Sequence, residues 1–243
     1  MKYRNIIFSL YGTLADINTD ESDPKLWESL SEFYSWQGAE LDPYAIKTFY
    51  DEEVRKQLSD VRLSFPELLH VDMDVSRVFE ALYRRGGLES PEYPLKETAE
   101  FFREKSVRYL GLRPGALDLL DRLEGDGFDL FLLCNAQSSY TLPDLKKLGI
   151  EDYFKGIYLS SDYKTAKPEK AFFDMLLRQE GLDKEETVMI GSDLSEDIEG
   201  AKEAEIDSIY VCTLDEIPIG QKIPSVFVVK SGALSEIADF LCE

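Results

Sequence analysis

Apolar residues follow two different rhythms along the chain. Between residues 22 and 112 they recur at helical spacing, whereas after residue 112 short continuous apolar runs alternate with helical segments. The first region predicts four consecutive helices, which begin near Asp23-Pro24, Asp42-Pro43, Asp74 and Leu95, the last of them reaching Tyr109. Because no strand pattern interrupts these helices, we predict a compact helical unit.

The second region predicts a parallel sheet. Its apolar runs indicate strands over residues 128–134, 156–159, 187–190, 208–212 and 226–229, and helices are predicted between them over residues 115–123, 142–148, 168–179 and 196–205. Such alternation is typical of a parallel sheet that helices cover on both faces. The apolar run that begins at Ile6 supplies the first strand. We therefore predict an α/β fold, a doubly wound parallel sheet, with a core domain of residues 1–15 and 113–243 and an inserted helical unit of residues 16–112.

Composition narrows the range of partners. The chain has 243 residues, of which 44% are hydrophobic, so it can bury a large core. It carries 27 Lys and Arg against 48 Asp and Glu, a net charge of −21. That charge repels nucleic-acid backbones and anionic membrane surfaces, so we expect neither as a partner. A small anionic ligand would need a local cluster of hydrogen-bond donors. We expect a monomer.

The cysteines and the apolar runs indicate a compartment. Cys134, Cys212 and Cys242 lack metal-ligand spacing, and two of them lie in strand-like runs, which is typical of buried thiols in a reducing environment. The sequence has no signal-peptide pattern and no apolar run of about 18 residues. We therefore expect a cytoplasmic protein.

Polar residues follow four of the predicted strands. In an open α/β sheet the carboxyl ends of the strands share one edge, where ligands bind. The segments at these positions are Ser9 to Thr13, Cys134-Asn135, Lys167-Pro168 and Gly191 to Asp197. We expect all four to meet at one site.

Each segment has a chemical interpretation and a simpler structural one. Lys167 can hold an anionic group, although a single lysine is more often a surface residue. Backbone N–H groups around Gly12 and near Asn135 can cradle anionic oxygens. Asp193 and Asp197 offer the oxygen ligands that Mg²⁺ prefers. Asp193 could instead cap a helix that begins nearby.

Taken together, the four segments resemble the motifs of the haloacid dehalogenase-like (HAD) hydrolases. The matching residues, in order, are Ser9-Leu10-Tyr11-Gly12-Thr13-Leu14, Leu132-Leu133-Cys134-Asn135, Lys167-Pro168, and Gly191 to Asp197. The resemblance covers essentially the whole chain. It implies a Rossmann-like core, a helical cap formed by the inserted unit, a phosphatase acting on a small phosphorylated metabolite, and Mg²⁺ as the cofactor.

The resemblance also implies residue roles. The catalytic positions are Ser9, which occupies the nucleophile position, Tyr11, Cys134 and Lys167. The phosphate would contact Gly12, Thr13, Cys134, Asn135 and Lys167. The metal would be held by the backbone carbonyl of Tyr11 and by the carboxylates of Asp193 and Asp197.

Four departures from the family pattern bear on activity. Tyr11 stands where the family's phosphatases carry an acid/base, and Cys134 replaces the hydroxyl of the second motif. The other two concern Ser9 and the last motif. The family carries a nucleophilic Asp where this chain has Ser9, and a serine needs an adjacent base to attack. The chain's one histidine, His70, lies in the helical unit. In the last motif, either Ser192 replaces the usual Asp or the carboxylate has moved to Asp193, and we favour the move to Asp193.

Three functions stay open at this point. The first is a phosphatase, impaired unless Ser9 is an introduced substitution. The second is a non-catalytic relative that binds a phosphorylated metabolite or a partner, which Ser9 favours. The third is a 2-haloacid dehalogenase, which Tyr11 favours.

Overall fold

The core of the protein is a six-stranded sheet in which all neighbouring strands are parallel. The computed structural model describes residues 2–90, 92–212 and 222–242. The strands are β1 (Asn5–Phe8), β4 (Asp129–Cys134), β5 (Gly156–Leu159), β6 (Thr187–Gly191), β7 (Asp207–Val211) and β8 (Phe227–Val229), in the order β5-β4-β1-β6-β7-β8. The predicted α/β class with a doubly wound parallel sheet is confirmed.

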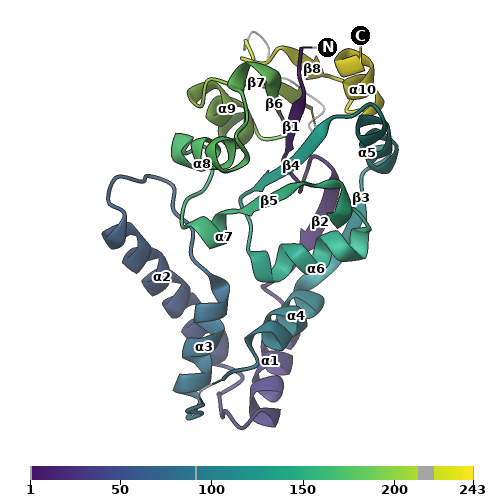
Figure 1. Ribbon diagram of the computed structural model, residues 1–243. Coiled ribbons are helices and arrows are strands. Elements are labelled where there is room, and N and C mark those ends of the chain that lie inside the picture. The colour runs from purple at the N-terminus through teal and green to yellow at the C-terminus, as the bar shows by residue number, and fades with distance from the viewer. Residues whose placement is uncertain (1, 91, 213–221, 243) are drawn as a thin grey trace.

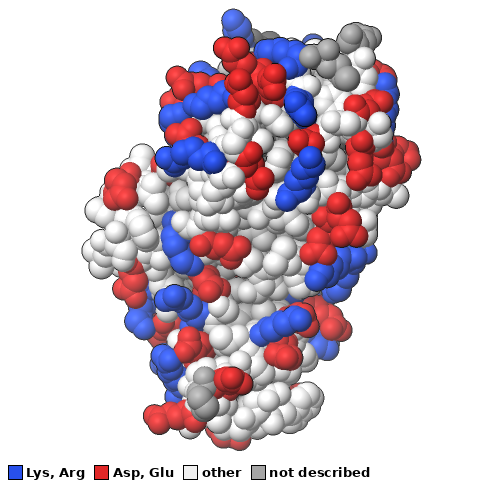
Figure 2. Space-filling view, in the orientation of Figure 1, with Lys and Arg blue, Asp and Glu red and all other residues white. Residues whose placement is uncertain are grey.

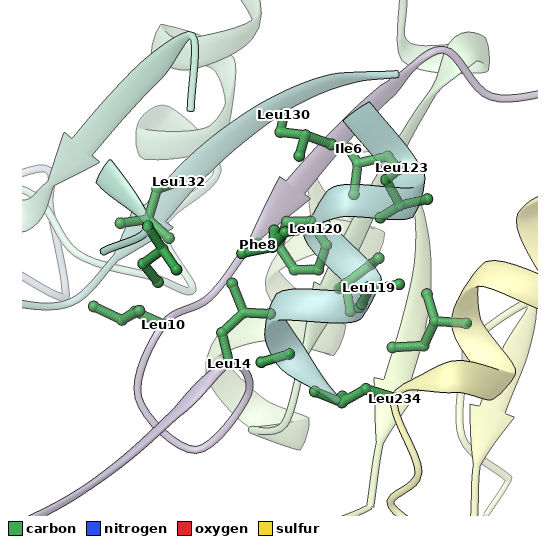
Figure 3. Packing of buried hydrophobic residues seen from close by; sticks show 14 of the residues in the cluster. Ile6, Phe8, Leu10, Leu14, Leu119, Leu120, Leu123, Leu130, Leu132 and Leu234 are labelled. Atoms are coloured by element: carbon green, nitrogen blue, oxygen red, sulfur yellow. The ribbon is translucent and has the colours of Figure 1, made fainter. Parts of the chain in front are cut away.

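Helices cover both faces of this sheet because its central strand is apolar on both sides. Ile6 and Phe8 of β1 pack toward α5 (Ala116–Gly125) and α10 (Ser235–Cys242), as Figure 3 shows for α5. Ile7 packs in a separate cluster with α8 (Lys170–Glu180) and α9 (Gly200–Glu203). The sequence analysis did not predict α10. The remaining core helices are α6 (Ser138–Leu148) and the short α7 (Ser160–Tyr163).

The inserted unit contains the four predicted helices. They are α1 (Pro24–Trp36), α2 (Ile46–Ser64), α3 (Val75–Arg85) and α4 (Leu95–Ser106), and they form a lobe of their own (Figure 1). The buried core of this lobe is rich in aromatic side chains. Asp23 and Asp74 cap α1 and α3 as predicted, each accepting a hydrogen bond from a backbone N–H two residues on. Helix α2 begins at Ile46 rather than at Pro43.

The prediction that this unit lacks strands is wrong. Helix α4 ends at Ser106, and the chain continues as β3 (Val107–Leu112), which pairs antiparallel with β2 (Ala15–Thr19). A pairing partner about 90 residues away decides this local structure, so helical spacing alone misses it. The β2–β3 pair lies where the chain enters and leaves the proposed insertion of residues 16–112. The division of the chain into these two domains stays a prediction.

The helix predicted over residues 196–205 is also divided. A π-helical turn, η3 (Leu194–Glu199), begins two residues earlier and leads into α9. Two short 3-10 turns, η1 (Glu151–Tyr153) and η2 (Lys184–Glu186), precede β5 and β6. Within the described ranges, no helix has the length and apolar character needed to cross a bilayer. Acidic and basic side chains are interspersed over the face shown in Figure 2.

Candidate functional site

The four predicted segments meet at the carboxyl end of the sheet. Phe8 and Ile190 are paired in adjacent strands, and the Ser9 N–H donates to the Ile190 carbonyl oxygen at 3.0 Å. The Asn135 side chain holds the Lys167 backbone from both sides, donating to its carbonyl at 2.9 Å and accepting from its N–H at 2.7 Å. Asn135 is thus placed to position Lys167.

Lys167 is buried between two partners. Its side chain forms an ion pair with Asp197, and its ammonium donates to Ser9 Oγ at 3.1 Å. Burial by itself lowers the pKa of Lys167, but the Asp197 carboxylate outweighs this effect and the pKa is raised. Lys167 therefore stays protonated and cannot remove the Ser9 proton.

The Asp197 carboxylate accepts hydrogen bonds that hold the site together. Besides the ion pair with Lys167, its Oδ2 accepts the backbone N–H groups of Ser192 and Asp193, both at 3.0 Å. Asp197 is 1% exposed. These contacts hold the last motif against Lys167 and leave the carboxylate little capacity to coordinate a metal.

The adjacent residues Asp193 and Ser192 of the last motif make different contacts. The exposed Asp193 side chain accepts from the N–H groups of Ser195 and Glu196 at 2.8 Å, so it caps η3. Ser192 Oγ instead accepts from Thr13 Oγ1 at 3.1 Å, and it would lie 2.8 Å from a Cβ added to Gly12. Ser192 thus contacts the first motif whereas Asp193 contacts η3, and the assignment of the motif's carboxylate to Asp193 stays a prediction.

The residues of the site do not fit a bound Mg²⁺. The Asp193 carboxylate caps η3 and the Asp197 carboxylate pairs with Lys167. Ser9 and Ser192 contribute only neutral hydroxyl groups. In the described part of the chain, no three His, Cys, Asp or Glu side chains are arranged to hold a metal ion. Mg²⁺ prefers carboxylate oxygens among its ligands. The metal roles of Asp193, Asp197 and the Tyr11 carbonyl stay predictions.

If Asp193 acts only as a cap, its loss should affect stability and not binding. We expect Asp193→Ala to lower the free energy of unfolding by about 1 kcal/mol, since two N–H groups of η3 lose their acceptor. Urea unfolding measures this change. Affinity for inorganic phosphate should stay as in the unaltered chain. A large loss of phosphate affinity with little loss of stability would instead return Asp193 to the binding site.

Tyr11 joins the core to the helical unit. Its hydroxyl donates to Asp144 Oδ2 on α6 at 2.7 Å, and Arg103 Nη2 on α4 reaches the Tyr11 oxygen at 3.1 Å. Arg103 Nη2 also donates to Asp144 at 2.7 Å. Burial raises the pKa of Tyr11 well above its usual range. Its proton is therefore held, and the side chain is not free to serve as an acid.

Sequence reasoning missed Arg103 and Asp144. The Asp144 side chain is 1% exposed and that of Arg103 is 12% exposed, so both charges are largely withdrawn from water. One sequence signal was available, because Asp144 occupies the apolar face of α6 beside Leu145. Nothing in the pattern of α4 distinguishes Arg103 from the exposed basic residues near it.

Cys134 and the loop after β1 complete the site. Burial raises the pKa of the Cys134 thiol, although Lys167 and the backbone N–H groups of Leu10 and Tyr11 favour its ionised form. The thiol is thus a weak donor. The N–H groups of Gly12 and Thr13 bond within the turn, to Ala15 and Leu10. These two N–H groups therefore already have acceptors within the turn, and the backbone cradle around Gly12 and near Asn135 stays a prediction.

Glu196 is a further group that sequence reasoning did not single out as a site residue. It is half-buried near Lys167, and burial raises the pKa of its carboxyl group while Lys167 opposes the change. A further carboxyl group therefore lies beside the Lys167–Asp197 pair.

Comparison with known proteins identifies the family of this site. Residues 69–211 match the model of the haloacid dehalogenase-like hydrolases. The chain belongs to this family. Its sequence is 30% identical over 214 residues to the pyrimidine 5′-nucleotidase PynA of Streptococcus pneumoniae. This alignment covers 86% of this chain and 84% of that protein. The resemblance inferred from the four motifs is confirmed.

Solved structures of HAD proteins share the fold. A 2-haloacid dehalogenase from Pseudomonas syringae superposes with a TM-score of 0.67 at 20% identity, covering 99% of this chain and 98% of that one. YfnB from Bacillus subtilis, solved with bound magnesium, superposes with a TM-score of 0.56 at 23% identity, covering 99% of both chains. At these identities the likeness concerns the fold of this HAD protein and not its chemistry.

Proposed function

We propose that this HAD protein binds a small phosphate ester at Ser9, Cys134, Lys167 and Ser192, and hydrolyses it at most very slowly. One observation carries the proposal. The buried Lys167 is retained, while two hydroxyl groups occupy the positions where the family's phosphatases carry carboxylates. The similarity to PynA makes a pyrimidine nucleoside monophosphate the ligand class to test first.

The contacts of Ser9 argue against hydrolysis by this hydroxyl. Ser9 Oγ accepts a hydrogen bond from a protonated Lys167, which lowers its nucleophilicity, and no base among the described residues contacts it. His70 lies elsewhere and contacts the Glu169 carboxylate at 3.0 Å. With no base beside it, Ser9 lacks what a nucleophilic serine requires.

The other two functions are supported less well. An ordinary HAD phosphatase and a 2-haloacid dehalogenase both attack with a carboxylate at the position of Ser9. A tyrosine at the position of Tyr11 resembles the dehalogenase motif, but its hydroxyl here is hydrogen-bonded to Asp144 and Arg103. A binding function needs only the donors that the site retains.

The proposal is tested by measuring binding and turnover together. Calorimetry should detect uridine 5′-monophosphate binding to the unaltered chain. Turnover of phosphate esters should stay orders of magnitude below the enzymatic median of about 10 s⁻¹. Lys167→Met should lose ligand binding, whereas Lys170→Met, which removes an exposed lysine three residues later, should not.

Two results would contradict the proposal. Turnover near the enzymatic median would show that the chain is an enzyme despite Ser9. Equal ligand affinity of the Lys167→Met and unaltered proteins, both folded by circular dichroism, would place the ligand elsewhere.

A further inference from the structure

The site's hydrogen bonds indicate how it holds an anion. We infer that this HAD protein binds the phosphate group directly, through serine hydroxyls and Lys167, and that no divalent cation takes part. The inference rests on the proposed function, because it concerns the same site. It departs from the Mg²⁺ that the family resemblance implies.

The exchange of carboxylate for hydroxyl reverses the hydrogen-bonding role of two positions. An ionised carboxylate only accepts hydrogen bonds, whereas a hydroxyl both accepts and donates. Ser9 Oγ already accepts from Lys167 at 3.1 Å, and Ser192 Oγ accepts from Thr13 Oγ1 at 3.1 Å. Among the described residues neither serine proton has an acceptor, so both remain available to a ligand oxygen.

Lys167 supplies a third donor in the same place. An ammonium has three N–H groups, and within the described chain this one contacts two acceptors, Ser9 and Asp197. Ser9 and Ser192 lie just beyond the ends of the adjacent strands β1 and β6, so their hydroxyls belong to the same edge as Lys167. Hydrogen-bond donors gathered at one sheet edge suit phosphate oxygens better than they suit a cation.

The charge balance is consistent with the loss of the metal. Two carboxylates and one divalent cation together carry no net charge, so removing all three leaves the charge that a phosphate meets unchanged. Two of the carboxylates that remain are already engaged, Asp197 by Lys167 and two N–H groups, and Asp193 by the start of η3. The third, Glu196, is half-buried near Lys167, and burial opposes its ionisation. At the positions of Ser9 and Ser192, Mg²⁺ would therefore meet hydroxyl groups in place of the carboxylates it prefers.

Calorimetry on the full chain tests the inference, with inorganic phosphate and uridine 5′-monophosphate as probes. Titration with MgCl₂ alone should give no binding heat. The affinity for each probe should be the same in EDTA as in millimolar Mg²⁺, or weaker in Mg²⁺, which complexes free phosphate. Ser9→Ala and Ser192→Ala should each weaken binding about tenfold or more in both buffers. Ser195→Ala, in the same loop, should bind as the unaltered chain does.

The double variant Ser9→Asp/Ser192→Asp provides the opposite case. It restores two carboxylates, so its affinity for both probes should rise on adding Mg²⁺ and fall in EDTA. Thermal unfolding of each variant shows whether it remains folded.

The outcomes separate this inference from the proposed function. Equal affinity in EDTA and Mg²⁺, with losses in both alanine variants, supports the inference. Binding by the unaltered chain only in Mg²⁺ overturns the inference and leaves the proposed function standing. No binding in either buffer overturns both. Metal-free binding that neither alanine variant weakens overturns the assignment of the two serines as donors.

Discussion

The double variant Ser9→Asp/Ser192→Asp is expected to hydrolyse p-nitrophenyl phosphate at least about 100-fold faster than the unaltered chain. The change places a carboxylate nucleophile at the end of β1 and a second carboxylate beside it at the end of β6. Two adjacent carboxylates attract a divalent cation, which relieves their mutual repulsion. Lys167 remains in place to neutralise charge on the phosphate, so the variant would contain a nucleophile, a metal site and a cation.

The restored activity should nevertheless be partial. General acid catalysis typically contributes about 10²- to 10⁴-fold, and Tyr11 cannot supply it while its hydroxyl is bonded to Asp144. The rate should therefore depend steeply on the leaving group, with activated esters turned over and alkyl phosphates nearly inert.

Stopped assays with Mg²⁺ and with EDTA measure this gain. Each single variant should show a smaller gain than the double one, because one carboxylate does not hold the metal and attack at once. Adding Lys167→Met to the double variant should abolish the activity. A folded double variant that binds Mg²⁺ but shows no turnover would mean that the site is adapted to binding in ways beyond these two side chains.

The second large effect concerns stability. Asp144→Ala is expected to lower the free energy of unfolding by about 3–5 kcal/mol, because Arg103 would remain largely buried without its carboxylate partner. The Tyr11 hydroxyl would also lose its closer acceptor and keep only Thr141 Oγ1 at 3.3 Å. For a chain of this size that loss corresponds to a fall in melting temperature of about 6–20 °C. Urea and thermal unfolding measure both quantities.

An exposed ion pair of the same chain is the control. Arg122 and Asp239 are 2.7 Å apart with side chains 45% and 66% exposed, and Asp239→Ala should leave the free energy of unfolding nearly unchanged. The double variant Arg103→Met/Asp144→Leu should recover much of the loss, since an apolar pair leaves no buried charge. Equal effects of Asp144→Ala and Asp239→Ala would show that the α4–α6 contact contributes little.

Patterns that depend on near neighbours were predictable from the sequence. The apolar runs identified every strand of the main sheet, because a strand buried on both faces must be apolar throughout. Asp23 and Asp74 predicted two helix starts, since a cap bonds to an N–H only two residues away. The order of four motifs at strand ends placed Ser9, Asn135 and Lys167 at one edge, because parallel strands share that edge.

What the sequence left open depended on partners distant along the chain. The β2–β3 pair was not predicted because each strand is short and its partner is separated from it along the chain by the whole inserted unit. The linkage of Tyr11, Arg103 and Asp144 brings together three elements that no local pattern connects.

The last motif shows the same division most clearly. The sequence alone determined that Gly191 to Asp197 follows a buried strand and contains Ser192 and Asp193 as adjacent polar residues. Adjacent residues leave the backbone in different directions, so one faces the sheet edge and the other faces solvent. Only the tertiary structure decided which, by placing Thr13 of the first motif against Ser192 and the start of η3 against Asp193. The reason is physical: a side chain's role is set by the group it contacts, and here one of those groups lies about 180 residues away.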